Sequence, residues 1–401
     1  MDKSSLREEL VKIVGEKNYT DDELDILSYS SDMGALPEEI LELYGFKKAE
    51  YIVLPQTTEH VAAIVELANK TGIPLTLRGG ASTGYGGSVP VSGGVILDLT
   101  AMKKVIELNE KDKTVTVQCG MTCKELLNFL SKKGYHQGIY PSSAYTATIG
   151  GFISMGGSAG IGAPKYGSIA KQVIGLKVVL ANGKTVDTEN ENLPDVERQN
   201  DVSKLFIGSE GIFGIITEAK LRIYPEEKGF VACTVAFNDL DSALKSTSET
   251  LHKKVVPHTL HVMDSAFLKN LKKAGVESPD VDAMILTAFE GPTNADVDRD
   301  KTAFIKICRN NGGKELGSDV ADREWAHRYK IELLFKRLGP TMIPLEVLSS
   351  VEDASKIIKS WKKTANDKKV DLSIFAILGD EQQFLLMPMA LVNELNKGQF
   401  V

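Results

Sequence analysis

The spacing of apolar residues in the first part of the chain predicts short strands that alternate with helices. A short apolar run at 51–54, closed by a proline, predicts a strand, and apolar residues at helical spacing predict a helix over 59–71. A second strand is predicted at 73–77, which completes a strand–helix–strand unit with parallel strands and a right-handed crossover. Upstream, residues 4–15 and 21–28 are predicted to form short amphipathic helices.

Farther along, the pattern predicts strand pairs rather than strand–helix–strand units. Strands are expected at 95–99, 102–108, 114–118, 174–180, 184–186 and 221–224, and a helix is expected at 123–133. The dipeptide Asn182-Gly183 lies between two of these strands and is the signature of a two-residue hairpin.

From Phe230 onward, strand-like and helix-like runs alternate and glycine-rich loops no longer occur. Strands are expected at 230–236, 256–263, 283–289, 342–348 and 372–378, and helices at 239–254, 264–274, 294–310, 322–337 and 352–368. This alternation predicts a separate α+β domain in which helices cover one face of a sheet. The predicted domains are therefore 1–228 and 229–401, with the boundary near 225–230.

Glycine-rich segments interrupt the first domain at 78–87, 148–167 and 208–217. The segment TIGGFISMGGSAGIGAPKYG (148–167) is the longest of them and contains seven glycines in 20 residues. Glycine loses more conformational freedom on folding than any other residue, so such a run is expected where the backbone must approach something closely. Bare backbone N–H groups can then bind an anion such as a phosphate. A flexible loop is the alternative, although Phe152, Met155 and Ile161 make this segment more apolar than a glycine–serine linker.

Neither standard phosphate-binding motif fits the central glycine segment. A P-loop requires a lysine where this chain has Ala163. A dinucleotide-binding turn requires a third glycine, but Gly160-Ile161-Gly162 is followed by Ala163, Pro164 and Lys165. The failed dinucleotide pattern disfavours a nicotinamide dehydrogenase.

Charge and composition exclude several function classes. The net charge of −7 and a pI near 5.6 disfavour nucleic acid as the main partner, because phosphate binding needs clustered lysine and arginine. The N-terminus MDKSSLREEL lacks the apolar region of a signal peptide, and no run is long enough to span a membrane, so a cytoplasmic protein is predicted. Cys119, Cys123, Cys233 and Cys308 are predicted to be ordinary thiols, because no second cysteine pair or nearby histidine completes a zinc site.

Taken together and in this order, the glycine segments resemble the FAD-binding domain of the vanillyl-alcohol-oxidase-like (PCMH-type) flavoproteins. The resemblance is carried by RGGASTGYGG (78–87), PSSAYTATIGGFISMGGSAG (141–160) with KYG (165–167), and GSEGIFGIIT (208–217). Within these flavoproteins the chain is similar to the FAD-linked D-lactate dehydrogenase and glycolate-oxidase-subunit group, which the phrase LPQTTEHVAAIVELANKTGIPLTLRGG (54–80) also supports. The resemblance covers residues 25–225 well and the rest loosely.

The resemblance implies a fold, a cofactor and a set of contacts. It implies an FAD domain of two α+β subdomains, followed by a ferredoxin-like α+β cap that closes over the flavin. Around the pyrophosphate of FAD, the resemblance places Arg78, Gly79, Gly80, Ala81, Ser82 and Thr83. Along the isoalloxazine side and the phosphates, it places Pro141, Ser142, Thr148, Gly150, Gly151, Ser154, Gly157, Ser158, Ala159 and Gly160. Near the adenosine and ribitol parts, it places Glu210, Gly211, Ile215 and Ile216, with Pro55 at the adenine end. Some relatives attach flavin covalently through a histidine in the first loop, where this chain has Gly80-Ala81-Ser82, so non-covalent FAD is expected.

The cap departs from the pattern of this group at its catalytic segment. Relatives carry a GDGN segment ending in a histidine, whereas this chain has Leu378-Gly379-Asp380-Glu381-Gln382-Gln383-Phe384. Relatives also continue beyond the position of Val401. A natural divergence, a different substrate and a shortened chain would each account for this difference.

Other residues must therefore supply the chemistry of the cap. The segment Arg323-Glu324-Trp325-Ala326-His327-Arg328 resembles the cap helix whose arginine meets the substrate carboxylate, which makes Arg328 and His327 the candidate catalytic residues. Glu346 is a further candidate, because relatives often have an acidic residue there. His258 and His261 are three apart on a predicted strand, which places them on opposite faces and disfavours a shared metal; no metal is expected.

Three functions remain open at this point. The first is oxidation of a small D-2-hydroxy acid by FAD, with electrons passed to a protein or quinone acceptor. The second is a flavin-binding electron-transfer subunit, or a degenerate relative without its own hydroxy-acid chemistry. The third is a different oxidoreductase of the same fold that acts on an alditol or alcohol. A homodimer or a partner subunit is compatible with each of them.

Overall fold

The computed structural model describes residues 3–34, 45–189, 201–329, 333–338, 341–380 and 383–392. The chain divides into two compact units. The first comprises Met1–Gln137, Ser143–Gly157 and Ile169–Tyr224, and the second comprises Gly138–Ser142, Ser158–Ser168 and Pro225–Val401. Two short pieces of the glycine-rich region therefore pack with the C-terminal half of the chain.

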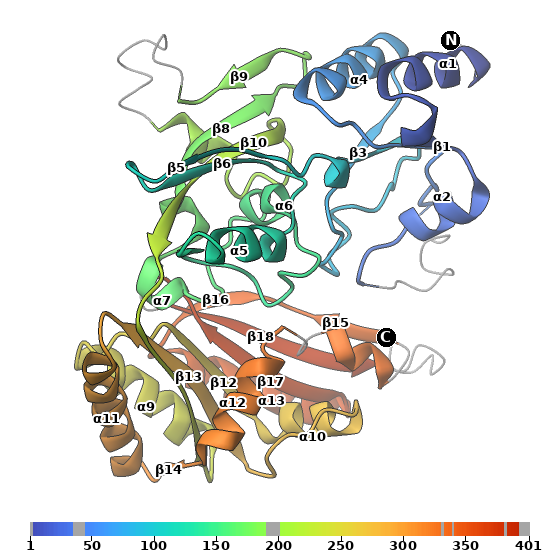
Figure 1. Ribbon diagram of the computed structural model, residues 1–401. Helices are drawn as coiled ribbons and strands as arrows, with labels where there is room; N and C mark the ends of the chain where they lie inside the picture. Colours follow the sequence, from blue (N-terminus) through green and yellow to red (C-terminus); the bar gives the residue numbers. More distant parts are fainter. Residues whose placement is uncertain are drawn as a thin grey trace. The chain divides into compact units, whose positions relative to one another are not determined.

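One sheet of the first unit has the strand order β1-β2-β4-β3. Its strands are β1 (Tyr19–Thr20), β2 (Tyr51–Val53), β4 (Val95–Asp98) and β3 (Leu75–Arg78), and the helices beside it are α1 (Lys3–Val14), α2 (Glu23–Tyr29) and α4 (Thr58–Thr71) (Figure 1). The predicted strand–helix–strand unit is present, and both of its strands run parallel to β4, which lies between them. Helix α4 begins where the Thr57 hydroxyl accepts from the His60 N–H, and it ends at Gly72 with φ +73°.

The other sheet of the first unit is antiparallel where its strand pairs are defined, with the order β5-β6-β10-β8-β9, and β7 pairs with β10. Its strands are β5 (Val105–Asn109), β6 (Thr114–Gln118), β7 (Tyr135–Gln137), β8 (Val173–Val179), β9 (Thr185–Asp187) and β10 (Ile215–Pro225). Helices α5 (Cys123–Ser131) and α6 (Ile149–Ser154) and the short 3-10 turns η1 (Glu16–Asn18), η2 (Leu99–Ala101), η3 (Ile169–Lys171) and η4 (Val202–Leu205) complete the unit. Two sheets in one unit agree with the two expected subdomains.

The second unit is built on one sheet with the order β14-β11-β13-β12-β17-β18-β15, and β16 also pairs with β18. The strands are β11 (Gly229–Phe237), β12 (Thr259–Asp264), β13 (Ala283–Gly291), β14 (Lys314–Glu315), β15 (Thr341–Pro344), β16 (Val347–Ser350), β17 (Asp371–Leu378) and β18 (Gln383–Val392). The helices are α7 (Ala163–Tyr166), α9 (Leu240–His252), α10 (Ser265–Lys273), α11 (Asn294–Asn310), α12 (Ser318–His327), α13 (Ala354–Lys368) and the 3-10 turn η5 (Leu333–Arg337). Its strand pairs are antiparallel, and the α+β class is confirmed.

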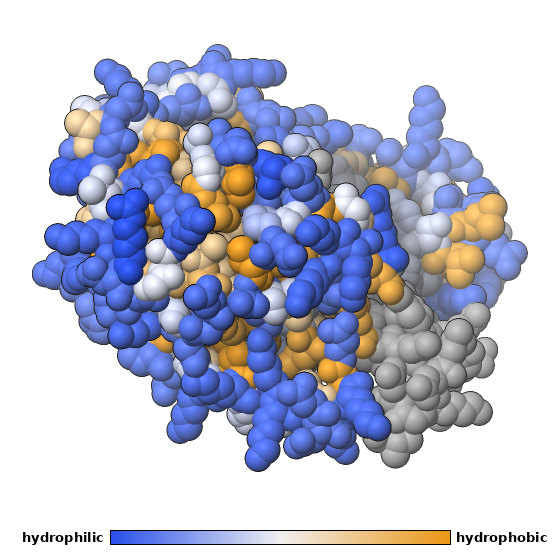
Figure 2. Space-filling model, turned by 90° about the horizontal axis from the view of Figure 1, so that it is seen from below, coloured by the Kyte–Doolittle hydropathy of each residue, from blue (hydrophilic) through white to orange (hydrophobic). Residues whose placement is uncertain are grey.

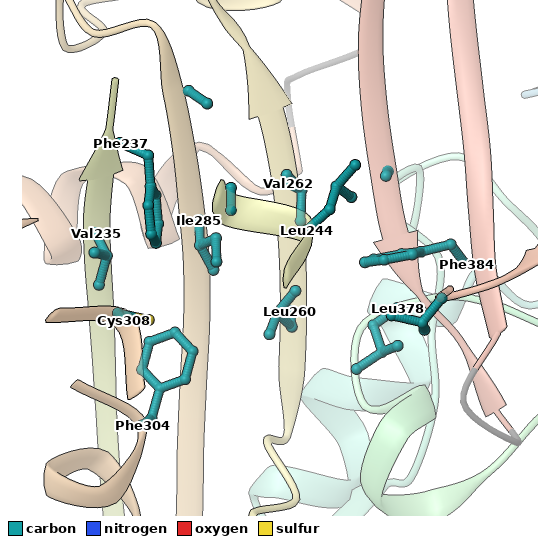
Figure 3. Packing of buried hydrophobic residues seen from close by; sticks show 14 of the residues in the cluster. Val235, Phe237, Leu244, Leu260, Val262, Ile285, Phe304, Cys308, Leu378 and Phe384 are labelled. Carbon is teal, nitrogen blue, oxygen red and sulfur yellow. The ribbon is translucent and has the colours of Figure 1, made fainter. Parts of the chain in front are cut away.

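Both faces of this sheet bury apolar side chains. On one face, Leu260 and Val262 of β12 and Ile285 of β13 pack with Leu244 of α9 and Phe304 of α11 (Figure 3). On the other face, a second buried cluster joins strand residues to α10 and η5: Met263, Leu286, Phe375, Phe267 and Phe335 are among its members. The expectation of a sheet covered on one face is therefore wrong, because strands such as β13 are apolar at almost every position and need cover on both sides.

Strand β18 was not expected, because Pro388 interrupts its apolar run. On one side of β18, Pro388 lies opposite Ile374 of β17. On the other side, β16 pairs with residues 383–386 and β15 pairs with residues 389–392, so Pro388 lies between these two partners. A missing N–H is tolerated there, since no residue of β15 or β16 is paired with that position. The predicted helix over 322–337 is also different, because α12 ends at His327 and a separate 3-10 turn follows.

The face of the molecule in Figure 2 is mostly hydrophilic, and its hydrophobic residues lie in separate small areas. Single exposed apolar residues of this kind are normal on protein surfaces. Over the described residues, we find no helix that combines the length and the apolar character needed to cross a membrane.

Candidate functional site

The first glycine cluster lies directly against the chain that precedes α6. A Cβ atom at Gly80 would come within 1.7 Å of the Thr146 carbonyl oxygen, and one at Gly79 would come within 2.4 Å of the Thr148 Oγ1 atom. Real Cβ atoms do not approach other atoms this closely, so only glycine permits this contact. The two segments are therefore held together because Gly79 and Gly80 lack side chains.

The third glycine cluster meets the other two within the first unit. A Cβ atom at Gly211 would come within 2.5 Å of the Leu77 side chain, at the end of β3. The N–H groups of Gly208 and Glu210 donate to the carbonyl oxygens of Ile153 and Ser154 at the end of α6, each at 3.0 Å. Glycine segments far apart in the sequence thus form one continuous surface.

Backbone donors of the first cluster remain available on this surface. Within the described part of the chain, the N–H groups of residues 79 to 83 donate no hydrogen bond to another protein atom. Ala81 has φ +45°, a left-handed conformation that is uncommon for a residue with a side chain. Successive free N–H groups in a loop with such a residue form a concave anion site, which fits the pyrophosphate of FAD.

Three of the residues expected to contact FAD, Arg78, Gly150 and Gly151, donate hydrogen bonds within the protein. The Nη1 atom of Arg78 donates to the carbonyl oxygens of Tyr29 and Ser31 at 3.0 and 2.9 Å, so this nitrogen holds the end of α2. The N–H groups of Gly150 and Gly151 donate to Cys119 O and to Thr148 Oγ1. The N–H groups of Gly150 and Gly151 are therefore used at the first turn of α6.

The remaining predicted FAD residues fall into two groups. In the first unit, Pro55, Ile215 and Ile216 are buried, while Ser154 is half-buried and Gly157, at φ +32°, lies against the ring of Phe152. In the second unit lie Pro141, Ser142, Ser158, Ala159 and Gly160. There, Ala159 pairs with Gly379, and a Cβ atom at Gly160 would come within 2.8 Å of the Tyr140 carbonyl oxygen.

The second unit presents a half-buried arginine between aromatic rings. The guanidinium carbon of Arg328 lies 4.3 Å from the ring centre of Trp325 and 4.2 Å from that of Tyr329. Its Nη1 donates to Trp325 O at 2.7 Å and its Nη2 donates to the Tyr329 hydroxyl at 3.0 Å. The Nε atom is buried and has no hydrogen-bond partner among the described residues. An oriented cation with an unused donor is suited to bind a carboxylate.

A chain of contacts connects Arg328 to strand β12. Tyr329 stacks on Tyr140, with ring centres 6.0 Å apart, and Tyr140 pairs with Ile161. The next residue, Gly162, donates its N–H to Thr259 Oγ1 at 3.1 Å. The same hydroxyl lies 2.9 Å from His258 Nδ1, and the His258 ring lies 6.1 Å from the Trp325 ring. We call the residues of this closed path, from Arg328 through Tyr140 and Thr259 back to Trp325, the Arg328 site.

A group of charged residues adjoins the Arg328 site. Lys165 Nζ lies 3.1 Å from Glu227 and 3.2 Å from Glu290, and the Tyr166 hydroxyl donates to the same oxygen of Glu290. His258 Nε2 lies 3.8 Å from the other oxygen of Glu290. These contacts fix the segment 165–166 and His258 to Glu290.

His261, on β12, is a functional candidate that sequence reasoning missed. It is 1% exposed, and neither ring nitrogen has a hydrogen-bond partner among the described residues. Burial lowers the pKa of His261 to about 3, and the electrostatic effects of Arg328 and His258 lower it further. The expected placement of His258 and His261 on opposite faces does not hold. His258 precedes β12, and its ring turns to the hydroxyl of Thr259, which shares a face with His261.

The other predicted catalytic residues, His327 and Glu346, also belong to the second unit. His327 is the last residue of α12, and Glu346 is exposed between β15 and β16. Within the described ranges, no group of three or more potential ligands could hold a metal ion.

The segment that replaces GDGN has a structural role where it is described. The Asp380 carboxylate accepts the N–H of Ser168 at 3.0 Å, and the Asp380 N–H donates to Ser158 O at 3.3 Å. Asp380 therefore fixes the segment 158–168 to the sheet. Glu381 and Gln382 lie outside the described residues.

Two family models match consecutive parts of this chain. The model described as FAD binding domain matches residues 49–189, and the one described as FAD linked oxidases, C-terminal domain, matches residues 226–397. The first range contains two of the glycine clusters, and the second contains the sheet of the second unit and the Arg328 residue.

Relatives that match 60% to 94% of this chain carry related names. Glycolate oxidase subunit GlcD of Bacillus subtilis is 28% identical, over 94% of this chain and 79% of its own length. D-lactate dehydrogenase of Archaeoglobus fulgidus is 26% identical, over 82% of this chain and 73% of its own length. D-2-hydroxyglutarate dehydrogenase of Stutzerimonas stutzeri is 30% identical, over 60% of this chain and 52% of its own length.

Solved structures show the same fold at lower identity. Alkyldihydroxyacetonephosphate synthase aligns with a TM-score of 0.80 at 21% identity, over 98% of this chain and 78% of its own. p-Cresol methylhydroxylase aligns with a TM-score of 0.81 at 17% identity, over 99% of this chain and 84% of its own. With both family models, the relatives and the fold in agreement, the chain belongs to the FAD-linked oxidases and is an oxidoreductase that uses FAD.

Proposed function

We propose that the protein oxidises a small D-2-hydroxy acid, of the D-lactate or glycolate type, with non-covalently bound FAD as the hydride acceptor. The observation that carries the proposal is the Arg328 site. Its cation is ordered by two aromatic rings and retains a buried Nε–H without a partner among the described residues. The names of the relatives, which include a D-lactate dehydrogenase and a glycolate oxidase subunit, support the same substrate class.

Arg328 would bind the carboxylate of the substrate. A carboxylate oxygen would accept from the Nε–H and thereby satisfy the donor that lacks a partner. Trp325 and Tyr329 restrict the guanidinium to one orientation, so little side-chain freedom is lost when the anion binds. The aromatic walls also reduce contact with water, which strengthens the ion pair.

Residues of the first unit would hold the cofactor. The free N–H groups of residues 79 to 83 would bind its pyrophosphate, and the glycine contacts to Thr146 and Thr148 keep that loop in place. When bound, FAD supplies the two-electron oxidant that no amino acid side chain provides. We extend the proposal to the other FAD contacts expected from the sequence, from Pro55 to Ile216, and to a protein or quinone that removes the electrons.

An anaerobic visible spectrum tests the proposal. The purified protein is recorded before and after addition of D-lactate, glycolate and D-2-hydroxyglutarate in turn, with L-lactate as the stereochemical control. Loss of the oxidised flavin absorbance with one of the D-acids or glycolate, and not with L-lactate, is the expected result. A flavin that is reduced by dithionite and by none of these acids would contradict it.

A flavin-binding electron-transfer subunit is the second candidate function. The observation that favours it is Asp380, whose carboxylate is committed to Ser168 and which lies in the segment where relatives have GDGN. The relative named as a subunit of glycolate oxidase is compatible with it as well. This alternative predicts that the hydroxy acids do not reduce the flavin, whereas dithionite and a partner subunit do. Reduction by an alditol instead would support the third function, a different alcohol oxidoreductase of the same fold.

A further inference from the structure

His261 is a polar side chain in an apolar row of the sheet. It lies on β12 directly between Leu286 of β13 and Ile377 of β17. Its ring meets the edge of Phe375, with ring centres 5.1 Å apart. Both ring nitrogens are buried, and neither has a hydrogen-bond partner among the described residues.

A buried imidazole without partners is unfavourable. In water both nitrogens would be hydrogen-bonded, and most buried polar side-chain atoms in proteins do have a partner. Burial keeps the ring neutral, since the pKa of His261 is lowered to about 3. A neutral ring has one donor and one acceptor nitrogen, so His261 is suited to a ligand hydroxyl, which both donates and accepts.

His261 shares a face of the sheet with the Arg328 site. Thr259 is two residues before His261, so the two side chains point to the same side of β12. The hydroxyl of Thr259 belongs to the contact path that leads through His258 and Trp325 to Arg328. The residues beside Thr259 in the same row are Ala232 of β11 and Ala288 of β13, both small.

We propose that His261 binds the 2-hydroxyl of the substrate whose carboxylate Arg328 holds, and that it accepts the hydroxyl proton during oxidation; this rests on the proposed function. The C2–H bond breaks and its electron pair leaves with the hydrogen as hydride, which reduces FAD. The O–H bond breaks and its proton moves to the acceptor nitrogen of His261. The hydroxy acid becomes a 2-keto acid, and His261 becomes an imidazolium ion until the proton is released. The substrate carboxylate beside Arg328 offsets the positive charge that disfavours this ion.

Variants of His261 in the FAD-loaded protein separate binding from proton transfer. His261→Gln keeps a hydrogen-bonding side chain but cannot act as a base, whereas His261→Leu removes both properties. The matched control is His252→Leu, because His252 is an exposed histidine near the end of α9. Each variant is first assayed for the rate of flavin reduction. Its photoreduced form is then titrated by calorimetry with the hydroxy acid that reduces the flavin and with the analogue that lacks the hydroxyl. The analogue is propionate for D-lactate and acetate for glycolate.

The expected results differ between the variants. In both His261 variants, the rate of flavin reduction should fall by about 100-fold or more, because a general base typically contributes at least this factor to the rate. The wild-type protein should bind the hydroxy acid about tenfold more tightly than its analogue, and His261→Leu should lose this preference while its affinity for the analogue stays the same. His261→Gln should retain part of the preference. The control His252→Leu should match the wild type in every measurement.

Other outcomes contradict the proposal at distinct steps. If no hydroxy acid reduces the wild-type flavin, the proposed function and this inference are both wrong. If the wild type is active and His261→Gln reduces its flavin within about threefold of the wild-type rate, the general base lies elsewhere and only this inference is wrong. His261→Gln decides the matter if the leucine variant does not fold, because it replaces one polar side chain by another that is close in volume.

Discussion

Replacement of Gly80 by alanine should release FAD, whereas replacement of Gly87 should not. Both glycines belong to the same segment, 78–87. A Cβ atom at Gly80 would come within 1.7 Å of the Thr146 carbonyl oxygen, while one at Gly87 would find nothing within 4 Å. The pair therefore isolates the close contact from the general effect of adding a methyl group and removing backbone freedom.

The size of the effect follows from this contact. To reach the 3.0 Å below which real Cβ atoms are not found, the loop must move by about 1.3 Å away from Thr146. Forcing an extra methyl group into a packed site costs about 1–3 kcal/mol. The shift also displaces the free N–H groups of residues 79 to 83, whose hydrogen bonds to a charged phosphate contribute about 1.5–3 kcal/mol each. Loss of one such bond corresponds to a rise in Kd for FAD of about 10- to 100-fold.

Fluorescence titration of the flavin-free proteins with FAD measures this rise directly. Thermal unfolding with and without a fixed excess of FAD gives an independent value, because a ligand that binds only the folded state stabilises it by RT ln(1 + [L]/Kd) and so raises Tm. Gly87→Ala should agree with the wild type in both measurements. A Gly80→Ala protein that binds FAD within about threefold of the wild type would refute the reasoning, since the loop would then have moved without disturbing its donors.

Three further changes test the second unit. Arg328→Ala should raise KM for the hydroxy acid by about 100-fold, because a charge-assisted hydrogen bond to the carboxylate is lost. The control Arg299→Ala, at an exposed position of α11, should leave KM unchanged. If both variants have the same KM, Arg328 does not bind the substrate carboxylate. Burial raises the pKa of Glu324 from about 4.5 in the unfolded chain to about 7, so folding favours the protonated form and the protein loses stability as the pH rises from about 4.5 to about 7. In urea unfolding at several pH values, Glu324→Gln should lose less stability over this range than the wild type. An unchanged pH profile would contradict the burial argument. Burial lowers the pKa of His261 from about 6.5 in the unfolded chain to about 3, so the contribution of the neutral ring to stability is lost as the pH falls below about 6.5. On acid unfolding, His261→Gln should take up about one proton fewer than the wild type. Equal proton uptake by the two proteins would show that His261 is not neutral in the folded protein.

The fold of the first unit could be predicted from the sequence because its signals are local. The strand–helix–strand unit begins with a proline-closed strand and a threonine-capped helix, and α4 starts within one residue of its predicted position. The three glycine clusters were recognisable because each departs from ordinary composition. What the sequence did not show is which N–H groups stay free, since Gly150 and Gly151 are paired through contacts with Cys119 and Thr148.

The second unit was predicted less completely because its signals are not local. Strand β18 contains a proline that disfavours a strand in isolation, and only the exchange of its neighbours, β16 and β15, at Pro388 makes it tolerable. The cover on the second face of the sheet depends on α10 and on Phe335, which belong to the same buried cluster as Phe375. Neither relationship can be read from residue spacing along one segment.

His261 shows what information a single strand carries and what it lacks. The sequence Leu260-His261-Val262-Met263 places one polar residue in an apolar strand, which is a signal, but a satisfied core histidine would give the same pattern. The distinction lies in the neighbouring strands: β13 and β17 place Leu286 and Ile377 beside His261, and neither can donate or accept a hydrogen bond from its side chain. His258, by contrast, obtains Thr259 and Glu290 as neighbours. Two histidines three residues apart thus meet different surroundings: His258 has polar partners within the protein, whereas the ring nitrogens of His261 have none among the described residues.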